Sequence, residues 1–406
     1  MALSLTADQD KVRIINRSII LNTLRLNAPI SRAELASLTG LNRSTVSNII
    51  SALIDEGLVL ETEQQNSKGG RPAISLSLRR DGGAVIGLEI GVDFIAILLT
   101  NFVAETIWEA RIQTSPAQSQ IEIITQAELL VDQALQNARE QHLRPLGMGV
   151  GLPGLVNIRQ GELIIAPNLK WNNIPLRLMW NQRFRLPIYI ENEANLAALG
   201  EYYYGVARGV ENFVYLSSGI GLGGGIMIAG KLFRGGNGYA GEIGHIQRDP
   251  HGEQCGCGRI GCWETQVGPR AVLRRVKKEL KTTPDKFLPE ACEGDFDKLT
   301  FDQIVKFALE GNNICRQAIE DVAFHLGTGI ADLVNIFNPE LIVIGGAFIL
   351  GREILLPVIK KSLFSQALPP SAENLRIAFS DRGDNACVSG AVAVVLDDIL
   401  REMTIV

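Results

Sequence analysis

The pattern of apolar and polar positions changes once along the chain, from helical periodicity near the start to mostly strand-like runs later. Apolar residues recur every three or four positions over residues 11–26 and again over residues 43–56, which predicts two amphipathic helices. Between them, Ser31-Arg-Ala-Glu34 has the form of a capping box, in which two side chains satisfy backbone groups at the start of a helix. The box predicts a short helix over residues 32–38 that ends at Gly40.

The third of these helices has two different faces. Val46, Ile50 and Leu53 belong to its apolar stripe, whereas the other face carries arginine, serine, threonine and asparagine instead of the glutamate and lysine of an ordinary solvated surface. Such side chains read base edges or bind phosphates. The pattern therefore predicts a helix-turn-helix, with a generic helical hairpin as the alternative. The predicted DNA-binding residues in this part are Arg32, Arg43, Ser44, Thr45, Ser47 and Asn48.

Two short alternating segments, at residues 58–61 and 74–78, predict the two strands of a wing. The loop between them ends in Lys68-Gly-Gly-Arg-Pro72, which is a thin cationic tip. An arginine in such a tip can enter a minor groove, where the potential is most negative. Lys68 and Arg71 therefore join the predicted DNA-binding residues.

The rest of the chain predicts α/β structure. Strand-like runs, longer amphipathic segments and glycine turns form two successive β-β-β-α-β-α blocks, which suggests a duplicated fold with a cleft between two lobes. Ligands of such sheets bind beyond the carboxyl ends of the strands. The predicted strands are residues 84–90, 94–100, 106–113, 146–150, 187–190, 213–217, 341–344 and 375–379, and the predicted helices include residues 120–140, 313–337 and 389–401.

A candidate metal site lies within residues 241–264. His245, Cys255, Cys257 and Cys262 have the spacing His-x9-Cys-x-Cys-x4-Cys, and a Cys-x-Cys pair cannot easily close on itself as a disulfide. Four nitrogen and sulfur ligands on a glycine-rich loop suit a structural zinc site, and the alternative is a chance cluster of reduced cysteines. A complete ligand set leaves no open position, so we expect Zn²⁺ to be structural and not catalytic.

Glu242 and Glu264 flank His245 in the same stretch. A histidine that binds a metal through one ring nitrogen keeps the other nitrogen to donate a hydrogen bond. That donor beside two carboxylates suits the hydroxyl groups of a sugar, because charge-assisted hydrogen bonds are the stronger kind.

Three domains follow from these patterns. Residues 1–81 are predicted to form a winged helix-turn-helix DNA-binding domain. Residues 82–195 form the first α/β lobe, which the C-terminal helix at about 388–402 joins. Residues 196–387 form the second lobe, with the zinc loop and a dimerisation surface.

Charge and composition agree with a DNA-binding head on a larger body. The 406 residues have a net charge of −5, but residues 1–80 carry +3 and the rest carry −8, which suggests that the head meets a polyanion. Neither an apolar run of 18 residues nor a signal-peptide pattern is present in the sequence. With the metal-type cysteine spacing, this predicts a cytoplasmic protein without a membrane partner.

These motifs together resemble the ROK family of repressors and sugar kinases, which has an actin-like, sugar-kinase fold. The resemblance covers residues 84–406, and a winged helix at the N-terminus is what the repressor branch carries. The form Glu191-Asn-Glu-Ala-Asn195 is most similar to that of the family's xylose repressors. The other matching motifs are Gly149-Val-Gly-Leu-Pro-Gly154, Asn168-Leu-Lys-Trp171, the glycine run at 219–225, Gly241-Glu-Ile-Gly-His245 with its cysteines, and Ile344-Gly-Gly346.

The resemblance implies roles for individual residues. In the family's kinases, a carboxylate in an Asn-Asp pair acts as base on the sugar hydroxyl, and the matching pair here is Asn192-Glu193. By the same resemblance, Glu242, His245 and Glu264 would hold sugar hydroxyls. These five residues are the predicted sugar-binding set.

The resemblance also implies an altered phosphate-binding hairpin. The kinases open this hairpin with Asp-x-Gly-Gly-Thr, whereas this chain has Glu89-Ile-Gly-Val-Asp93. Val92 replaces the second glycine, and the charge of Asp93 would oppose each ATP phosphate at ~4 Å by on the order of 4 kcal/mol. The base is also one methylene longer, because it is Glu193. We therefore predict no enzymatic activity and no catalytic residue.

The resulting prediction is a sugar-responsive transcriptional regulator, most simply a repressor of genes for sugar catabolism or uptake. It would bind a palindromic operator as a homodimer or homotetramer and would respond to a free sugar in the cleft between its lobes. One alternative is an ATP-dependent sugar kinase with an accessory DNA-binding head. Another is a repressor that a protein partner controls.

Overall fold

The computed structural model describes residues 9–63, 74–115, 117–282 and 295–402. Its contacts divide the chain into two compact units. The first unit comprises Met1–Val150, Leu176–Ile190 and Ala391–Val406, and the second comprises Gly151–Pro175 and Glu191–Gly390. The division differs from the predicted domains, because the winged helix groups with the first lobe and residues 151–175 and 191–195 group with the second.

The head of the chain folds as a winged helix-turn-helix, as predicted. Ser31 and Glu34 form both hydrogen bonds of the capping box, and the chain leaves the second helix through Gly40. Leu21, Leu35 and Val46 are fully buried in its small core. Its elements are α1 (Gln9–Asn27), β1 (Ile30–Ser31), α2 (Arg32–Thr39), α3 (Arg43–Asp55), β2 (Val59–Glu63) and β3 (Ile74–Leu78), and its sheet has the order β1-β3-β2.

The first α/β sheet has the strand order β11-β7-β4-β5-β6. β4 pairs antiparallel with β5, and β5 pairs antiparallel with β6. Every residue of β4 is buried, which agrees with its mostly apolar sequence, in which Glu89 is the one charged residue. The elements are β4 (Ala84–Ile90), β5 (Phe94–Asn101), β6 (Thr106–Gln113), α4 (Gln120–Glu140), β7 (Pro145–Leu152), α5 (Leu176–Phe184) and β11 (Ile188–Asn192).

The second sheet has the order β14-β13-β12-β15-β16. Its central strand β12 is antiparallel to β13 and parallel to β15. In both sheets the first strand along the chain lies in the centre, between the second and the fourth strands. This shared order confirms the predicted duplication. The strands are β12 (Phe213–Ser218), β13 (Leu222–Ile228), β14 (Lys231–Leu232), β15 (Leu341–Gly346) and β16 (Arg376–Phe379).

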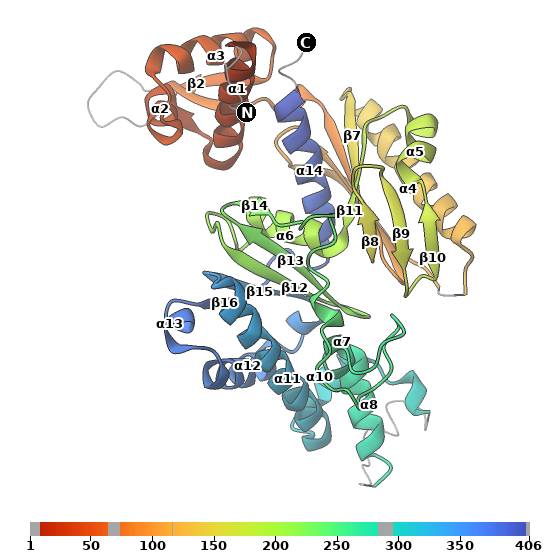
Figure 1. The fold of residues 1–406 in the computed structure, drawn as a ribbon. Coiled ribbons are helices and arrows are strands. Elements are labelled where there is room, and N and C mark those ends of the chain that lie inside the picture. Colours follow the sequence, from red (N-terminus) through yellow and green to blue (C-terminus); the bar gives the residue numbers. More distant parts are fainter. Residues whose placement is uncertain (1–8, 64–73, 116, 283–294, 403–406) are drawn as a thin grey trace, which may run out of the picture. The chain divides into compact units, whose positions relative to one another are not determined.

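The helices α7, α8, α10, α11, α12 and α13 contribute buried residues to one large core with this sheet. The long helix α11 packs against α12, α10 and α8 (Figure 1). None of the helices that the structure describes is long and apolar enough to cross a membrane. The helices are α6 (Glu193–Tyr204), α7 (Trp263–Gln266), α8 (Pro269–Glu279), α10 (Phe301–Leu309), α11 (Asn313–Phe337), α12 (Arg352–Gln366) and α13 (Pro369–Ala372).

Several elements were not predicted. A small sheet of order β10-β9-β8 is formed by β8 (Leu155–Asn157), β9 (Glu162–Ala166) and β10 (Trp171–Ile174). The helices α5 and α12 were also missed. In α12 the interior Pro357 broke the sequence pattern, although the helix continues through it.

The last helix, α14 (Ala386–Glu402), contributes residues to both units. Its first turns lie against α6 so closely that a Cβ on Gly390 would lie 1.7 Å from the Leu196 carbonyl oxygen. Farther along, the Arg25 guanidinium of α1 pairs with Asp397 at 2.6 Å. Both side chains of this pair are largely buried, at 5% and 14% exposure. A single helix therefore contacts both α6 and the DNA-binding head.

Candidate functional site

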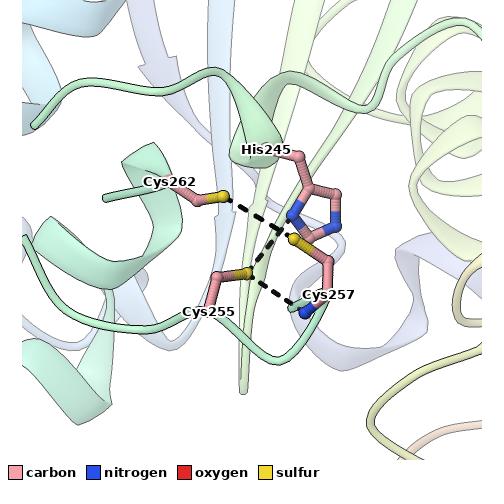
Figure 2. A group of neighbouring side chains, drawn as sticks. All are labelled: His245, Cys255, Cys257 and Cys262. Atoms are coloured by element: carbon pink, nitrogen blue, oxygen red, sulfur yellow. Dashed lines mark hydrogen bonds between the residues drawn. The ribbon is translucent and has the colours of Figure 1, made fainter. Parts of the chain in front are cut away.

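Four side chains from residues 245–262 converge on one point. The ligand atoms of His245, Cys255, Cys257 and Cys262 all lie within 4.8 Å of one another (Figure 2). His245 ends the short 3-10 helix η2 (Ile243–His245), and Cys262 directly precedes α7. The chain between them doubles back through a bridge between Gln247 and Cys262. The predicted ligand set is thus assembled by local chain reversal.

The geometry of this cluster fits a tetrahedral metal ion. The Sγ atoms of Cys257 and Cys262 are 3.7 Å apart. This is the edge of a tetrahedron whose metal–sulfur bonds are about 2.3 Å long, as they are for zinc. The Nδ1 atom of His245 lies 3.5 Å from Cys255 Sγ, so this ring nitrogen faces the cluster. The cluster is compatible with a zinc site.

Burial and the neighbouring Glu264 carboxylate raise the pKa of the Cys255 thiol. Two further thiols share the same small volume, so three thiolates together would be unfavourable without a cation. A divalent cation reverses this balance, because it binds the thiolate forms and releases their protons.

Glu264 connects the metal cluster to the start of strand β13. Its Oε1 atom accepts from the Cys255 thiol at 2.7 Å, and its Oε2 atom lies 3.4 Å from the Leu222 backbone nitrogen. Glycine at position 221 leaves room for this approach, because a Cβ there would lie 2.6 Å from Glu264 Oε2. The glycine run thus holds a carboxylate close to the strand end.

Glu242 lies on the other side of the histidine ring. Its Oε2 atom is 3.7 Å from His245 Nε2, the ring nitrogen that faces away from the cysteines. Burial raises the pKa of Glu242, and the nearby His245 opposes this shift. Glu242, His245 and Glu264 are therefore brought together, with the ring nitrogens of His245 divided between the cysteine cluster and Glu242.

The motif Glu191-Asn-Glu-Ala-Asn195 begins helix α6. The side chain of Asn192 caps this helix, since its Oδ1 atom accepts from the backbone of Ala194 and Asn195. Its Nδ2 atom donates to the Gly154 carbonyl at 3.0 Å and to Glu193 Oε2 at 3.1 Å. These bonds use the whole amide, so Asn192 positions its neighbours. Direct sugar binding by Asn192 stays a prediction.

Glu193 reaches the same strand end as Glu264. A Cβ on Gly223 would lie 3.6 Å from Glu193 Oε1, whereas Glu264 lies beside residues 221 and 222. Behind the motif, buried Glu191 accepts from Arg234 at 2.7 Å and from Asn195 at 3.1 Å. The start of β13 therefore brings Glu193 and Glu264 together, and the ion pair between buried Glu191 and partly exposed Arg234 holds the segment that carries Glu193.

Asn168 is a further residue at this position that was not predicted as a site residue. Its side chain lies 3.8 Å from a Cβ built on Gly221 and 3.5 Å from one built on Gly256. It is exposed and carries both a donor and an acceptor. The signal was its place in the motif Asn168-Leu-Lys-Trp171, which we used only for the resemblance.

The predicted DNA-binding residues differ in their exposure and in their contacts. Arg43, Ser44 and Asn48 are exposed at the start of α3, and Thr45 and Ser47 are half-buried. Arg32 instead binds Glu61 at 2.7 Å and the Ser47 carbonyl at 3.2 Å, so it holds α2, α3 and β2 together. Lys68 and Arg71 lie outside the described residues.

Comparison with known families decides the classification. The sequence matches the ROK family over residues 85–398 and a winged helix-turn-helix DNA-binding family over residues 16–59. The chain belongs to the ROK family.

Three members of the ROK family are similar to this chain over most of its length. The chain is 40% identical to the xylose repressor of Caldicellulosiruptor bescii, with 95% of this chain and 96% of that protein covered. A ROK family transcriptional regulator homologous to the Mlc protein of E. coli has the same fold, with a TM-score of 0.83, 29% identity and coverage of 97% and 98%. A ROK glucokinase from Streptomyces griseus, solved with glucose and AMPPNP, matches with a TM-score of 0.69, 31% identity and coverage of 77% and 99%.

The hairpin that carries the phosphate motif in ROK kinases has a closed turn here. The Gly91 backbone N–H donates to the Phe94 carbonyl at 2.9 Å, and the Phe94 ring lies where a Cβ on Gly91 would meet it at 2.4 Å. The Arg111 guanidinium covers that ring at 3.6 Å from its centroid. The Gly91 backbone donor is therefore already used, and Asp93 is exposed beside it.

Proposed function

We propose that this chain is a sugar-responsive transcriptional repressor with a structural zinc ion and no kinase activity. One observation carries the proposal. Glu193, Glu242, His245 and Glu264 gather at the start of β13 and the metal cluster, while the hairpin at residues 89–94 is closed. Binding of sugar hydroxyls needs side chains such as these four. Phosphoryl transfer needs a hairpin that is open to the ATP phosphates.

In this proposal Glu193, Glu242 and Glu264 accept hydrogen bonds from sugar hydroxyls, and His245 Nε2 donates one. Zinc holds Nδ1 of the same histidine, so its two nitrogens have fixed and different roles. Asn168 is the added candidate, because its amide lies beside Gly221 and Gly256. Xylose is the first sugar to test, since a relative that is 40% identical is named a xylose repressor.

The DNA-binding part of the proposal rests on α3. Arg43, Ser44 and Asn48 would contact bases or phosphates in the major groove, and a symmetric dimer would present two such helices to a palindromic operator. Exposed apolar side chains on α11, α12 and the loop after α12 are candidates for the contact between chains, and they are Phe324, Ile336, Phe364 and Leu368. Such an assembly on genomic DNA acts in the cytoplasm.

Sugar binding would reach the head through α14. Glu193 opens α6, which touches α14 backbone to backbone at Gly200 and Gly390. The same α14 holds α1 through Arg25 and Asp397. A sugar shifts this system only by its different affinity for the two forms of the protein, and resemblance to xylose repressors favours release of DNA.

A thermal-shift panel of free sugars, sugar phosphates and ATP tests the proposal. A ligand at 100 times its dissociation constant adds roughly 2.7 kcal/mol to the free energy of unfolding. We expect a shift with xylose, none with ATP, and loss of the xylose shift in Glu193→Ala and Glu242→Ala. A shift with ATP that sugar enhances would support the kinase alternative and overturn the proposal.

A further inference from the structure

Helix α8 follows the metal loop directly and carries a run of cations. Its buried face packs in the core of the second unit through Ala271, Val272 and Val276. On its exposed side, Arg270, Arg274 and Lys278 recur every fourth residue and therefore lie next to one another. Like charges at this spacing destabilise a helix by repulsion, so the stripe calls for a separate physical reason.

The stripe borders a hollow of about 760 Å³. Glu253 is the carboxylate among the described residues that line it, and one apolar side chain, Leu273, completes the wall. Glu253 lies 3.6 Å from Arg274 and so neutralises little of the surrounding charge. The cations that line the hollow are Arg270, Arg274, Arg275, Lys277, Lys278 and Lys281.

Arg275 is less exposed than the three cations of the stripe. It is half-buried, and its Nη1 atom donates at 3.2 Å to the Ala271 carbonyl of its own helix. Burial, followed by repulsion from Arg274, lowers the pKa of Arg275. An arginine stays charged at neutral pH nonetheless, so this guanidinium gains free energy from any anion that comes close.

We propose that this hollow binds a small metabolite that bears phosphate groups. Guanidinium groups bind phosphate oxygens in pairs, and the volume is in the range of small-molecule pockets. A DNA duplex presents its phosphates on a convex surface, which fits an extended groove and not a hollow of this size. The site is separate from the carboxylates at the start of β13, whose negative charges would repel a phosphate.

The same anion would influence the metal loop. Arg274 donates through Nη2 to the Thr265 carbonyl at 2.5 Å, and Thr265 lies in α7 next to Glu264. A phosphate that recruits Arg274 competes with this bond. The inference goes beyond the proposed sugar response, because binding of an anion at α8 does not depend on any sugar.

Calorimetric titration of the full chain with inorganic pyrophosphate tests the site. We expect one saturable site per chain. The double variant Arg270→Gln/Lys278→Gln should weaken binding by at least about tenfold, because it removes two charge-assisted hydrogen bonds. The matched control Lys360→Gln/Lys361→Gln removes the same charge from exposed positions on α12 and should leave affinity within about twofold, since distant surface charges are screened.

Two outcomes would overturn the inference. Absence of saturable binding, or equal weakening in both double variants, would mean that the stripe is only a charged surface. Displacement of pyrophosphate by duplex DNA of random sequence, through Arg270 and Lys278, would identify a nucleic-acid surface instead of a metabolite site. Pyrophosphate and duplex DNA of random sequence contain neither a free sugar nor the operator, so failure here is distinguishable from failure of the proposed sugar response.

Discussion

The turn at residues 89–94 and the loop at residues 241–264 differ in the hydrogen bonds that their polar groups already make. At residues 89–94 the backbone donor of Gly91 is used within the hairpin, and Phe94 with Arg111 covers the turn. Within residues 241–264, His245 Nδ1 lies 3.5 Å from Cys255 Sγ and 3.6 Å from Glu264 Oε1. His245 Nε2 lies 3.7 Å from Glu242 Oε2. The proposed function assigns sugar recognition and the altered phosphate-binding motif to two different turns, so the two can be tested separately.

The largest effect expected from this comparison follows removal of the metal. Cys262→Ala should abolish binding of one zinc ion per chain and lower the free energy of unfolding by about 3 kcal/mol or more, because a ligand that binds only the folded state stabilises it. The response to sugar should disappear at the same time, since His245 loses its fixed ring orientation.

Metal content per chain and thermal unfolding measure this prediction. The control is Cys387→Ala, which removes a buried thiol outside the cluster and should keep the zinc. Full zinc content in Cys262→Ala would contradict the metal assignment.

A second prediction concerns the Arg25–Asp397 ion pair, which joins α1 of the DNA-binding head to α14. Arg25→Ala leaves Asp397 buried without its partner and should lower the free energy of unfolding by about 3–5 kcal/mol. Asp397→Asn keeps the side-chain size and should reduce the effect of sugar on DNA binding while leaving sugar affinity unchanged.

The matched control for this link is Arg183→Ala. Arg183 also pairs with a carboxylate at 2.7 Å, but it is 42% exposed, so its loss should change stability by less than about 1 kcal/mol. Chemical denaturation of both arginine variants compares the two pairs directly. Equal costs would show that the Arg25 pair does not hold the head to α14.

The third prediction concerns DNA recognition by α3, which we expect to be independent of residues 89–94 and 241–264. Asn48→Ala should weaken operator binding by about 1–3 kcal/mol, as expected for loss of one contact to a base edge, with the sugar response intact. Ser51→Ala, at an exposed position farther along α3, should have little effect. Fluorescence anisotropy with labelled operator DNA measures both, and an equal loss in the two variants would argue against base reading by the start of α3.

The smallest effect is expected from repair of the hairpin sequence. Val92→Gly/Asp93→Thr restores the kinase-like residues, yet Phe94 and Arg111 still cover the turn. We expect no ATP turnover and an unchanged affinity for sugar in a coupled kinase assay. Appearance of sugar-dependent ATP hydrolysis would show that two residues alone closed the phosphate site.

Local sequence patterns predicted the parts of the structure whose causes are local. Strand β4 has the predicted bounds because nearly all of its residues are apolar, and the cluster of four candidate metal ligands was predicted because these residues lie in one short loop. The sequence pattern did not show which distant residues are bonded to each other. Arg32 was assigned to DNA, and in the structure it binds Glu61, which comes 29 residues later, so its contact with DNA stays a prediction.

The candidate site also contains contacts that the sequence did not show. The amide of Asn192 is used by the cap of α6 and by the Gly154 carbonyl, 38 residues earlier in the chain, and its predicted contact with sugar stays a prediction. β10 escaped prediction because only Trp171 and Ile174, its end residues, are buried, so no alternation is visible. Spacing alone did not reveal which polar atoms are already bonded.

The most direct test of the central claim is the affinity of the full chain for its selected operator DNA, measured by fluorescence anisotropy with and without saturating xylose. The account predicts that xylose weakens operator binding by about tenfold or more, a coupling free energy of ordinary size for two linked sites. It also predicts that ATP has no effect. Operator affinity that no free sugar changes would contradict the account.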